Sequence, residues 1–205
     1  MPTEGSRHAA DAPLRVRFDG YLSESMRLGA AASLASAEVG VAISVLYDPV
    51  EQGLVIVPAR PLRVGLGYTL TVDAAVVEGV DERRLDADLI VDFVAGNPTS
   101  AGGGPRPVVR FADIEADLRA ACGDCHGAPP GVYTPLTAAA LVEAPSKRRP
   151  GAVLVQPGAP LDSELVRRVL SDYPGTLGAP MPPDAPLDVA LQKRLVDWVR
   201  DGALP

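Results

Sequence analysis

A glycine- and proline-rich segment near the middle of the chain limits the possible folds more than any other feature. Residues 96–106 read Gly-Asn-Pro-Thr-Ser-Ala-Gly-Gly-Gly-Pro-Arg, with four glycines and no hydrophobic periodicity. This composition is typical of a flexible connector and disfavours a helix or strand. The chain has 205 residues, enough for two small domains. We therefore predict a linker at 96–106 with one domain on each side.

Upstream of the linker, apolar residues occur in short runs separated by Gly, Pro and Asp. Runs rich in Val, Ile, Leu, Tyr and Phe are typical of β-strands. Strands repeated at intervals of roughly 10 to 20 residues favour an antiparallel sandwich. We predict an all-β sandwich over residues 12–95, preceded by a polar N-terminal tail over 1–11. The expected strands are 14–18, 41–47, 54–57, 67–72 and 89–93.

Downstream of the linker, the apolar spacing changes to three and four residues. Phe111, Ile114, Leu118 and Ala121 share one face of an amphipathic helix that runs up to Cys122. Further helices are expected at 137–143, at 163–171 with Ser163 or Asp162 as N-cap, and from about 187 to Gly202. The sequence therefore predicts an all-α domain over residues 107–205.

The charge of the chain disfavours nucleic-acid binding, and its hydropathy disfavours a membrane-spanning segment. Asp and Glu outnumber Lys and Arg by 26 to 19, whereas a protein that tracks nucleic-acid phosphates needs clustered cations. No run of about 18 uncharged apolar residues is present, so we expect no membrane-spanning segment. No signal sequence is visible either, and a membrane anchor could have been lost with a missing N-terminus.

The only two cysteines lie three positions apart, in Cys122-Gly-Asp-Cys125-His126. This C-x-x-C-H pattern is the attachment sequence for c-type haem, because two thiols at this spacing reach the two vinyl groups of the porphyrin while the adjacent imidazole ligates the iron. A zinc site is disfavoured, since the only other Cys or His is His8 in the N-terminal tail. A thioredoxin-like dithiol is disfavoured because no βαβ pattern surrounds the motif.

A haem iron needs a second axial ligand, and the sequence offers Met181. It is the only methionine of the second half of the chain and stands in Ala-Pro-Met181-Pro-Pro, 55 residues after His126. A methionine between prolines is held extended and cannot serve a helix face. The basic cluster Lys147-Arg148-Arg149 is either a solvated loop, a contact to haem propionates or a docking surface for an acidic redox partner.

Two stretches of the chain resemble known families. Residues 54–62, Leu-Val-Ile-Val-Pro-Ala-Arg-Pro-Leu, with Gly-Tyr-Thr-Leu-Thr-Val at 67–72 and the closing Asp-Phe at 92–93, resemble bacterial Ig-like domains of the S-layer type. The C-x-x-C-H motif, Ser-Glu-Leu-Val-Arg-Arg-Val at 163–169, Pro-Met-Pro-Pro at 180–183 and Leu-Val-Asp-Trp-Val-Arg-Asp-Gly-Ala at 195–203 resemble the class I mono-haem cytochrome c family.

The second resemblance implies one covalent haem c, with thioether bonds to Cys122 and Cys125, His126 as proximal iron ligand and Met181 as distal ligand. It also implies that a proline carbonyl from Pro129, Pro130 or Pro135 orients the imidazole. With both axial positions filled, the expected function is one-electron transfer to redox partner proteins and no enzymatic reaction. The alternative is a haem sensor or peroxidase-like enzyme with a labile Met181. Both resemblances imply a location in the bacterial periplasm or outer cell envelope.

Overall fold

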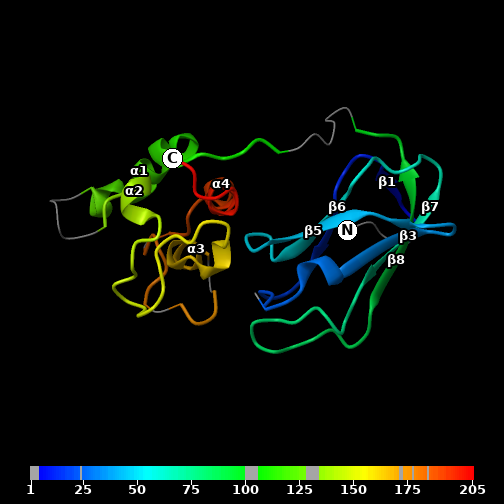
Figure 1. Ribbon diagram of the computed structural model, residues 1–205, viewed down its shortest axis with the longest axis horizontal. Helices are drawn as coiled ribbons and strands as arrows, with labels where there is room; N and C mark the ends of the chain where they lie inside the picture. The colour runs from blue at the N-terminus through cyan, green and yellow to red at the C-terminus, as the bar shows by residue number, and fades with distance from the viewer. Residues whose placement is uncertain are drawn as a thin grey trace. The chain divides into compact units, whose positions relative to one another are not determined.

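The computed structural model describes residues 5–23, 25–99, 106–127, 134–170, 173–176, 178–183 and 185–205. The chain divides into two compact units, Met1–Pro105 and Arg106–Pro205. Strands belong to the first unit and α-helices to the second (Figure 1). Each unit is described by itself below.

Two sheets form the first unit. The larger has the strand order β1-β8-β7-β3-β4 and the smaller β2-β6-β5. All neighbouring strands are antiparallel except β1 and β8, which run parallel with Arg7 opposite Val94. The strands are β1 (Arg7–Ala9), β2 (Leu14–Arg17), β3 (Ala32–Ser36), β4 (Gly40–Val41), β5 (Ile43–Asp48), β6 (Gly53–Pro58), β7 (Gly67–Val72) and β8 (Leu89–Gly96).

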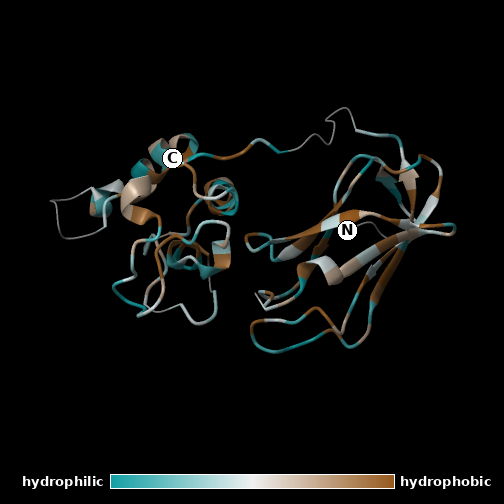
Figure 2. Ribbon diagram, in the orientation of Figure 1, coloured by the Kyte–Doolittle hydropathy of each residue, from teal (hydrophilic) through white to brown (hydrophobic). Residues whose placement is uncertain are grey.

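The core of the first unit consists of alternate residues from both sheets. In β7, Tyr68, Leu70 and Val72 are buried while the residues between them are more exposed, as expected for a strand with one face on the core. Tyr68 stacks on Phe93 of β8 with 5.9 Å between ring centroids. Figure 2 shows the resulting apolar stretches along these strands. Burial of one face therefore fixes the register of the sheets.

All five strand ranges expected from the sequence contain strands. The expected strand at 41–47 is divided, because the chain leaves the larger sheet after β4 and enters the smaller sheet at β5. Two strands were not expected. β1 lies within the segment predicted as a polar tail, and β3 lies in an Ala- and Ser-rich stretch whose composition does not favour strands.

The second unit contains four α-helices in the residues that the structure describes. They are α1 (Phe111–His126), α2 (Ala138–Leu141), α3 (Glu164–Val169) and α4 (Val189–Arg200). Isolated β-bridges hold the segment between α2 and α3, where Val142 pairs with Val155 and Val153 pairs with both Pro145 and Ser163. The Ser163 hydroxyl accepts from the Gln156 amide at 2.8 Å and makes no capping bond to α3.

Helices α1 and α4 pack together through aromatic rings. Phe111 and the fully buried Trp198 are tilted by 57° at a centroid distance of 5.3 Å. The Phe111 amide and the Trp198 indole N–H both donate to the Leu204 carbonyl, at 2.9 and 2.8 Å. Trp198 thus packs against α1, the first helix of this unit. Figure 2 shows both hydrophilic and hydrophobic residues around α4.

The expected all-α cytochrome c fold for residues 107–205 is wrong. Prolines at 145, 150, 157 and 160 lack the backbone N–H that a continuing helix needs, and the bridged loops take the place of helices there. In the described residues of the whole chain, strands outnumber α-helices by eight to four. No helix in the described part of the chain is long and apolar enough to cross a membrane.

Asp201, just after α4, forms hydrogen bonds that connect the end of the second unit to its start. Its carboxylate accepts from Arg106 at 2.7 and 2.9 Å and from the Val109 amide at 2.8 Å. The hydrogen bond from Arg106 is the main cause that lowers the pKa of Asp201 below its ordinary value. A carboxyl with a lowered pKa contributes stability above its unfolded-state pKa and loses it as the pH falls through the folded-state pKa.

We predict that Asp201→Asn lowers the free energy of unfolding of the second unit by about 1 kcal/mol at pH 7, through weaker hydrogen bonds. The difference from wild type should shrink only as the pH falls through the lowered pKa of Asp201, because the wild-type carboxyl stays ionised at the pH where an ordinary aspartate is protonated. Urea denaturation followed by fluorescence of Trp198, the chain's single tryptophan, reports on this unit alone. Glu115→Gln, which removes an exposed ion pair with Arg119, is the matched control and should change stability by less than about 0.5 kcal/mol.

Candidate functional site

Cys122, Cys125 and His126 lie in the last turn of α1. Residues three and four apart on a helix are neighbours on one face, so Cys122 adjoins both Cys125 and His126. Cys122 is half-buried and Cys125 is exposed, and both are free thiols. The helix stops at Gly127, whose amide donates to the Gly123 carbonyl at 2.6 Å. The helix end therefore presents two thiols and an imidazole together.

The environment of Cys122 disfavours its thiolate. Burial raises the pKa of Cys122 first, and the neighbouring Cys125 raises it further. Burial acts because a charged sulfur loses hydration, and Cys125 acts because two thiolates at this spacing repel each other. At neutral pH the Cys122 thiol is therefore protonated, and Cys125 is the thiol that a reagent or another protein can reach.

His126 is oriented by the backbone. Its Nδ1 lies 3.2 Å from the Thr134 carbonyl oxygen. Because a carbonyl oxygen only accepts hydrogen bonds, Nδ1 is the donor in this contact. Among the described residues, the carbonyl at the imidazole is that of Thr134, which precedes Pro135, and not that of Pro135 itself. Pro129 and Pro130, the other expected acceptors, lie outside the described residues.

Met181 lies on a different segment, which is fastened to α3. Its amide donates to the Arg168 carbonyl at 2.8 Å, and Arg168 Nη1 donates to the Ala179 carbonyl at 2.9 Å. These two bonds hold the loop before and at Met181. The structure thus brings Cys122, Cys125 and His126 together on α1 and anchors Met181 separately at α3.

Arg168 also forms the buried ion pair of the second unit. Its Nε donates to Glu164 Oε1 at 3.0 Å, with only 8% and 5% of the two side chains exposed. Neither Arg168 nor Glu164 is among the site residues expected from the sequence. The four-residue spacing of an acid and a base on one helix was the available signal for this pair, but spacing alone does not reveal burial.

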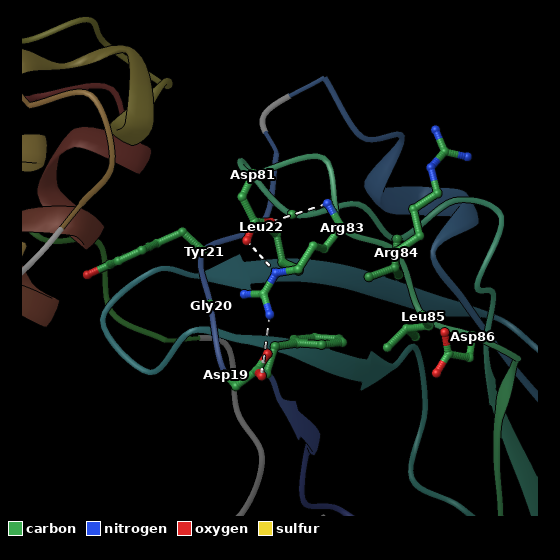
Figure 3. Close-up of a pocket in the computed structure, with 12 residues that line it drawn as sticks. Asp19, Gly20, Tyr21, Leu22, Asp81, Arg83, Arg84, Leu85 and Asp86 are labelled. Atoms are coloured by element: carbon green, nitrogen blue, oxygen red, sulfur yellow. Dashed lines mark hydrogen bonds and ion pairs between the residues drawn. The ribbon is translucent and has the colours of Figure 1, made fainter.

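A cavity of about 260 Å³ in the first unit is lined by residues that follow β2, among them Phe18, Asp19 and Tyr21. Figure 3 shows Arg83 between Asp81 and Asp19 at this cavity. The side-chain hydrogen bond to Arg83 is the main cause that lowers the pKa of Asp81. The ion pair with Arg83 therefore favours the ionised form of the Asp81 carboxyl.

Comparison with known proteins gives similarity to solved structures. No protein-family model matches the chain, and no curated protein matches it significantly.. Similar solved structures include surface layer protein SbsC, domains 1–6, at 10% identity and a TM-score of 0.38, covering 45% of this chain and 13% of that structure. Another is PcoC, a copper resistance protein from Escherichia coli, at 19% identity and a TM-score of 0.36, covering 45% of this chain and 90% of that one.

These findings overturn the cytochrome c interpretation. Residues 107–205 do not have the expected all-α fold, and in the residues that the structure describes no three His, Cys, Asp or Glu side chains form a group able to hold a metal ion. The expectation of haem c as cofactor is therefore wrong. Electron transfer through a haem iron, and the alternative of a haem sensor or peroxidase-like enzyme, are wrong with it. The motif spacing specifies which residues adjoin on α1, but it does not specify a cofactor. That Cys122, Cys125, His126 and Met181 share one site stays a prediction.

We predict that the two cysteines alkylate at different rates. Iodoacetamide should modify Cys125 first, and the rate at Cys122 should keep rising at a pH above that of an ordinary cysteine, because its pKa is raised. Peptide mass spectrometry after timed alkylation between pH 7 and 11 measures both rates. In 8 M urea the two rates should converge, and a difference that persists there would contradict the role of burial.

We predict that Glu164→Ala destabilises the second unit by about 3 kcal/mol, because it leaves the Arg168 charge buried without its partner. The double variant Glu164→Leu with Arg168→Met removes both charges and should recover most of that loss, although it also removes the bond to Ala179. Urea denaturation monitored by Trp198 fluorescence gives both values. A double variant less stable than Glu164→Ala would show that the two charges are not the cause.

Proposed function

We propose that the second unit is a non-catalytic thiol–disulfide exchange module, in which Cys122 and Cys125 exchange an electron pair with the thiols of a redox partner protein. The observation that carries the proposal is the pair of free thiols in one helical turn, one exposed and the other half-buried with a raised pKa. The chain contains no other cysteine, so any disulfide within one copy must join these two.

The helix geometry allows that disulfide. Three residues along an α-helix separate two Cα atoms by about 5 Å, which lies within the 4.4–6.8 Å range of disulfides. The bond would form at the end of α1, next to Gly127, where the backbone can adjust without breaking the packing of Phe111 at the other end. Oxidation would therefore change the last turn of α1 and leave the helix pair intact.

The exchange proceeds in two displacements. The Cys125 thiolate attacks one sulfur of a partner disulfide, forms a mixed disulfide and releases the other partner sulfur as a thiolate. Cys122 then loses its proton and attacks Cys125 Sγ, which releases the second partner thiolate. The partner gains two electrons, this chain is oxidised by two, and the two thiol protons pass to solvent or to the partner. The reverse sequence returns the module to the dithiol.

We assign no catalytic role to the first unit and place the protein in the bacterial cell envelope. The resemblance of residues 54–72 to S-layer type Ig-like domains supports this location, and disulfide chemistry is sustained outside the cytoplasm. In this proposal the β-sandwich acts as a spacer for the thiol-bearing unit.

The direct test is an intact-mass measurement after equilibration of the full chain in glutathione redox buffers. We expect loss of two mass units on oxidation, with both cysteines then protected from iodoacetamide, and full reversal by dithiothreitol. Two variants with one cysteine each, Cys122→Ser and Cys125→Ser, should not form the internal bond. Cysteines that stay alkylatable at every redox potential would overturn the proposal, as would a native protein whose thiols carry a group other than a disulfide.

The roles of the two thiols predict different behaviour in the single variants. Cys122→Ser keeps the attacking Cys125 but lacks the resolving thiol, so it should accumulate mixed disulfides with glutathione. Cys125→Ser should accumulate several-fold less, because the remaining Cys122 is half-buried and its pKa is raised. Mass spectrometry of both variants after the same exposure to oxidised glutathione measures the ratio. Equal adducts would contradict the assignment of Cys125 as the attacking thiol.

A further inference from the structure

β2 is an edge strand of the smaller sheet, and its free edge carries unpaired backbone groups. The sheet has the order β2-β6-β5, so β2 has a neighbouring strand on one side only. Arg15 lies opposite Val55 of β6. Just beyond the strand, in the same register, the Phe18 amide donates to the Gln52 carbonyl at 2.9 Å. Because hydrogen-bonded and non-hydrogen-bonded pairs alternate in an antiparallel ladder, the N–H and C=O groups of Arg15 and Arg17 point away from β6. No described residue forms a hydrogen bond with these groups.

The side chains of the same two residues lie on the outer face of the smaller sheet. Burial alternates along β2, and the side chains of Arg15 and Arg17 are its exposed ones. Arg17 forms an ion pair with Glu51. Within the part of the chain that the structure describes, the side chain of Arg15 makes no hydrogen bond or ion pair. The free edge of β2 therefore combines unpaired backbone groups with two exposed cations, of which one is uncompensated.

We propose that the free edge of β2 binds an extended acidic segment of a partner protein, which adds to the smaller sheet as an antiparallel strand. The partner residues opposite Arg15 and Arg17 lie two positions apart, and their side chains point to the same face as the two arginines. Carboxylates at these positions form cross-strand ion pairs with the guanidinium groups. Main-chain hydrogen bonds then supply affinity and the carboxylates supply specificity. The recognised pattern is an extended segment with two acidic residues separated by one residue.

The β2 strand of a second copy of this chain does not fit the same edge. Outward N–H groups occur on β2 only at Arg15 and Arg17, because the residue at the next outward position is Pro13, which has no N–H. Two antiparallel β2 strands could therefore pair only with arginine opposite arginine, and like charges directly opposite each other are destabilising. An acidic segment replaces this repulsion with attraction. The same two charges thus disfavour self-association and select the partner.

The test is an NMR titration of the full chain with the synthetic peptide acetyl-Thr-Glu-Val-Glu-Val-Thr-amide. We expect saturable shifts at β2 and slower hydrogen exchange of the Arg15 and Arg17 amides, which face the free edge. The Leu14 and Val16 amides already bond to β6 and should gain no protection. The peptide Thr-Val-Glu-Glu-Val-Thr has the same composition with adjacent glutamates and should bind several-fold more weakly. The peptide Thr-Lys-Val-Lys-Val-Thr should bind at least about tenfold more weakly.

Charge reversal at Arg15 provides the second test. Arg15→Glu keeps the backbone groups of the edge, so it should weaken the glutamate peptide at least about tenfold and strengthen the lysine peptide. Arg63→Glu makes the same charge change at an exposed residue before β7 and should alter either affinity by less than about threefold. Arg15 is exposed, so its substitution leaves the fold intact, and unchanged amide dispersion in the variant confirms this.

Three results would overturn the proposal. Absence of saturable shifts with the first peptide would show that the two arginines only keep other strands away from the edge. Shifts without slower exchange at Arg15 and Arg17 would show that the peptide contacts the face of the sheet and adds no strand. Equal affinity for the two glutamate peptides would show that net charge, and not strand register, attracts them. The edge belongs to the first unit, which contains no cysteine, so the outcome does not depend on thiol exchange.

Discussion

A buried arginine determines much of the structure of the second unit. The guanidinium of Arg168 lies in the interior where Glu164 offsets its charge, and removal of either partner would leave the other ion without hydration. The guanidinium also donates to the Ala179 carbonyl, and the backbone carbonyl of Arg168 accepts from the Met181 amide. Arg168 thereby joins α3 to the loop that carries Met181, in a region with little regular secondary structure of its own.

The sequence is informative where a local pattern matches a local structure. The continuous apolar run at 54–57 and the alternating apolar residues at 67–72 lead directly to β6 and β7, because both patterns are typical of strands. β1 was not predictable in this way, since a three-residue strand with one half-buried apolar residue gains its stability from pairing with β8, 87 residues away along the chain. β3 is similar, and its Ala and Ser residues form a strand because β7 and β4 flank it.

In the candidate site, too, local spacing could be predicted from the sequence and contacts with distant segments could not. The adjacency of Cys122, Cys125 and His126 follows from their spacing on a helix that the apolar residues of α1 predict. The partners that come from elsewhere in the chain do not follow from spacing. Neither the Thr134 carbonyl at His126 nor the anchoring of Met181 by Arg168 could be inferred without the packing of the loops. A short motif therefore specified which groups adjoin and left their chemistry open, which is why the haem interpretation went beyond its basis.

The parallel pairing of β1 with β8 determines how the first unit bears tension. The chain enters through β1 and leaves through β8, with Arg7 opposite Val94 and Ala9 opposite Gly96. A force that pulls the entry and exit of the chain apart slides these two strands along each other, so their hydrogen bonds share the load and break together. An antiparallel pair at the same place would open one bond at a time. The β-sandwich is therefore built to resist stretching along the chain, the property needed in a spacer between two attachment points.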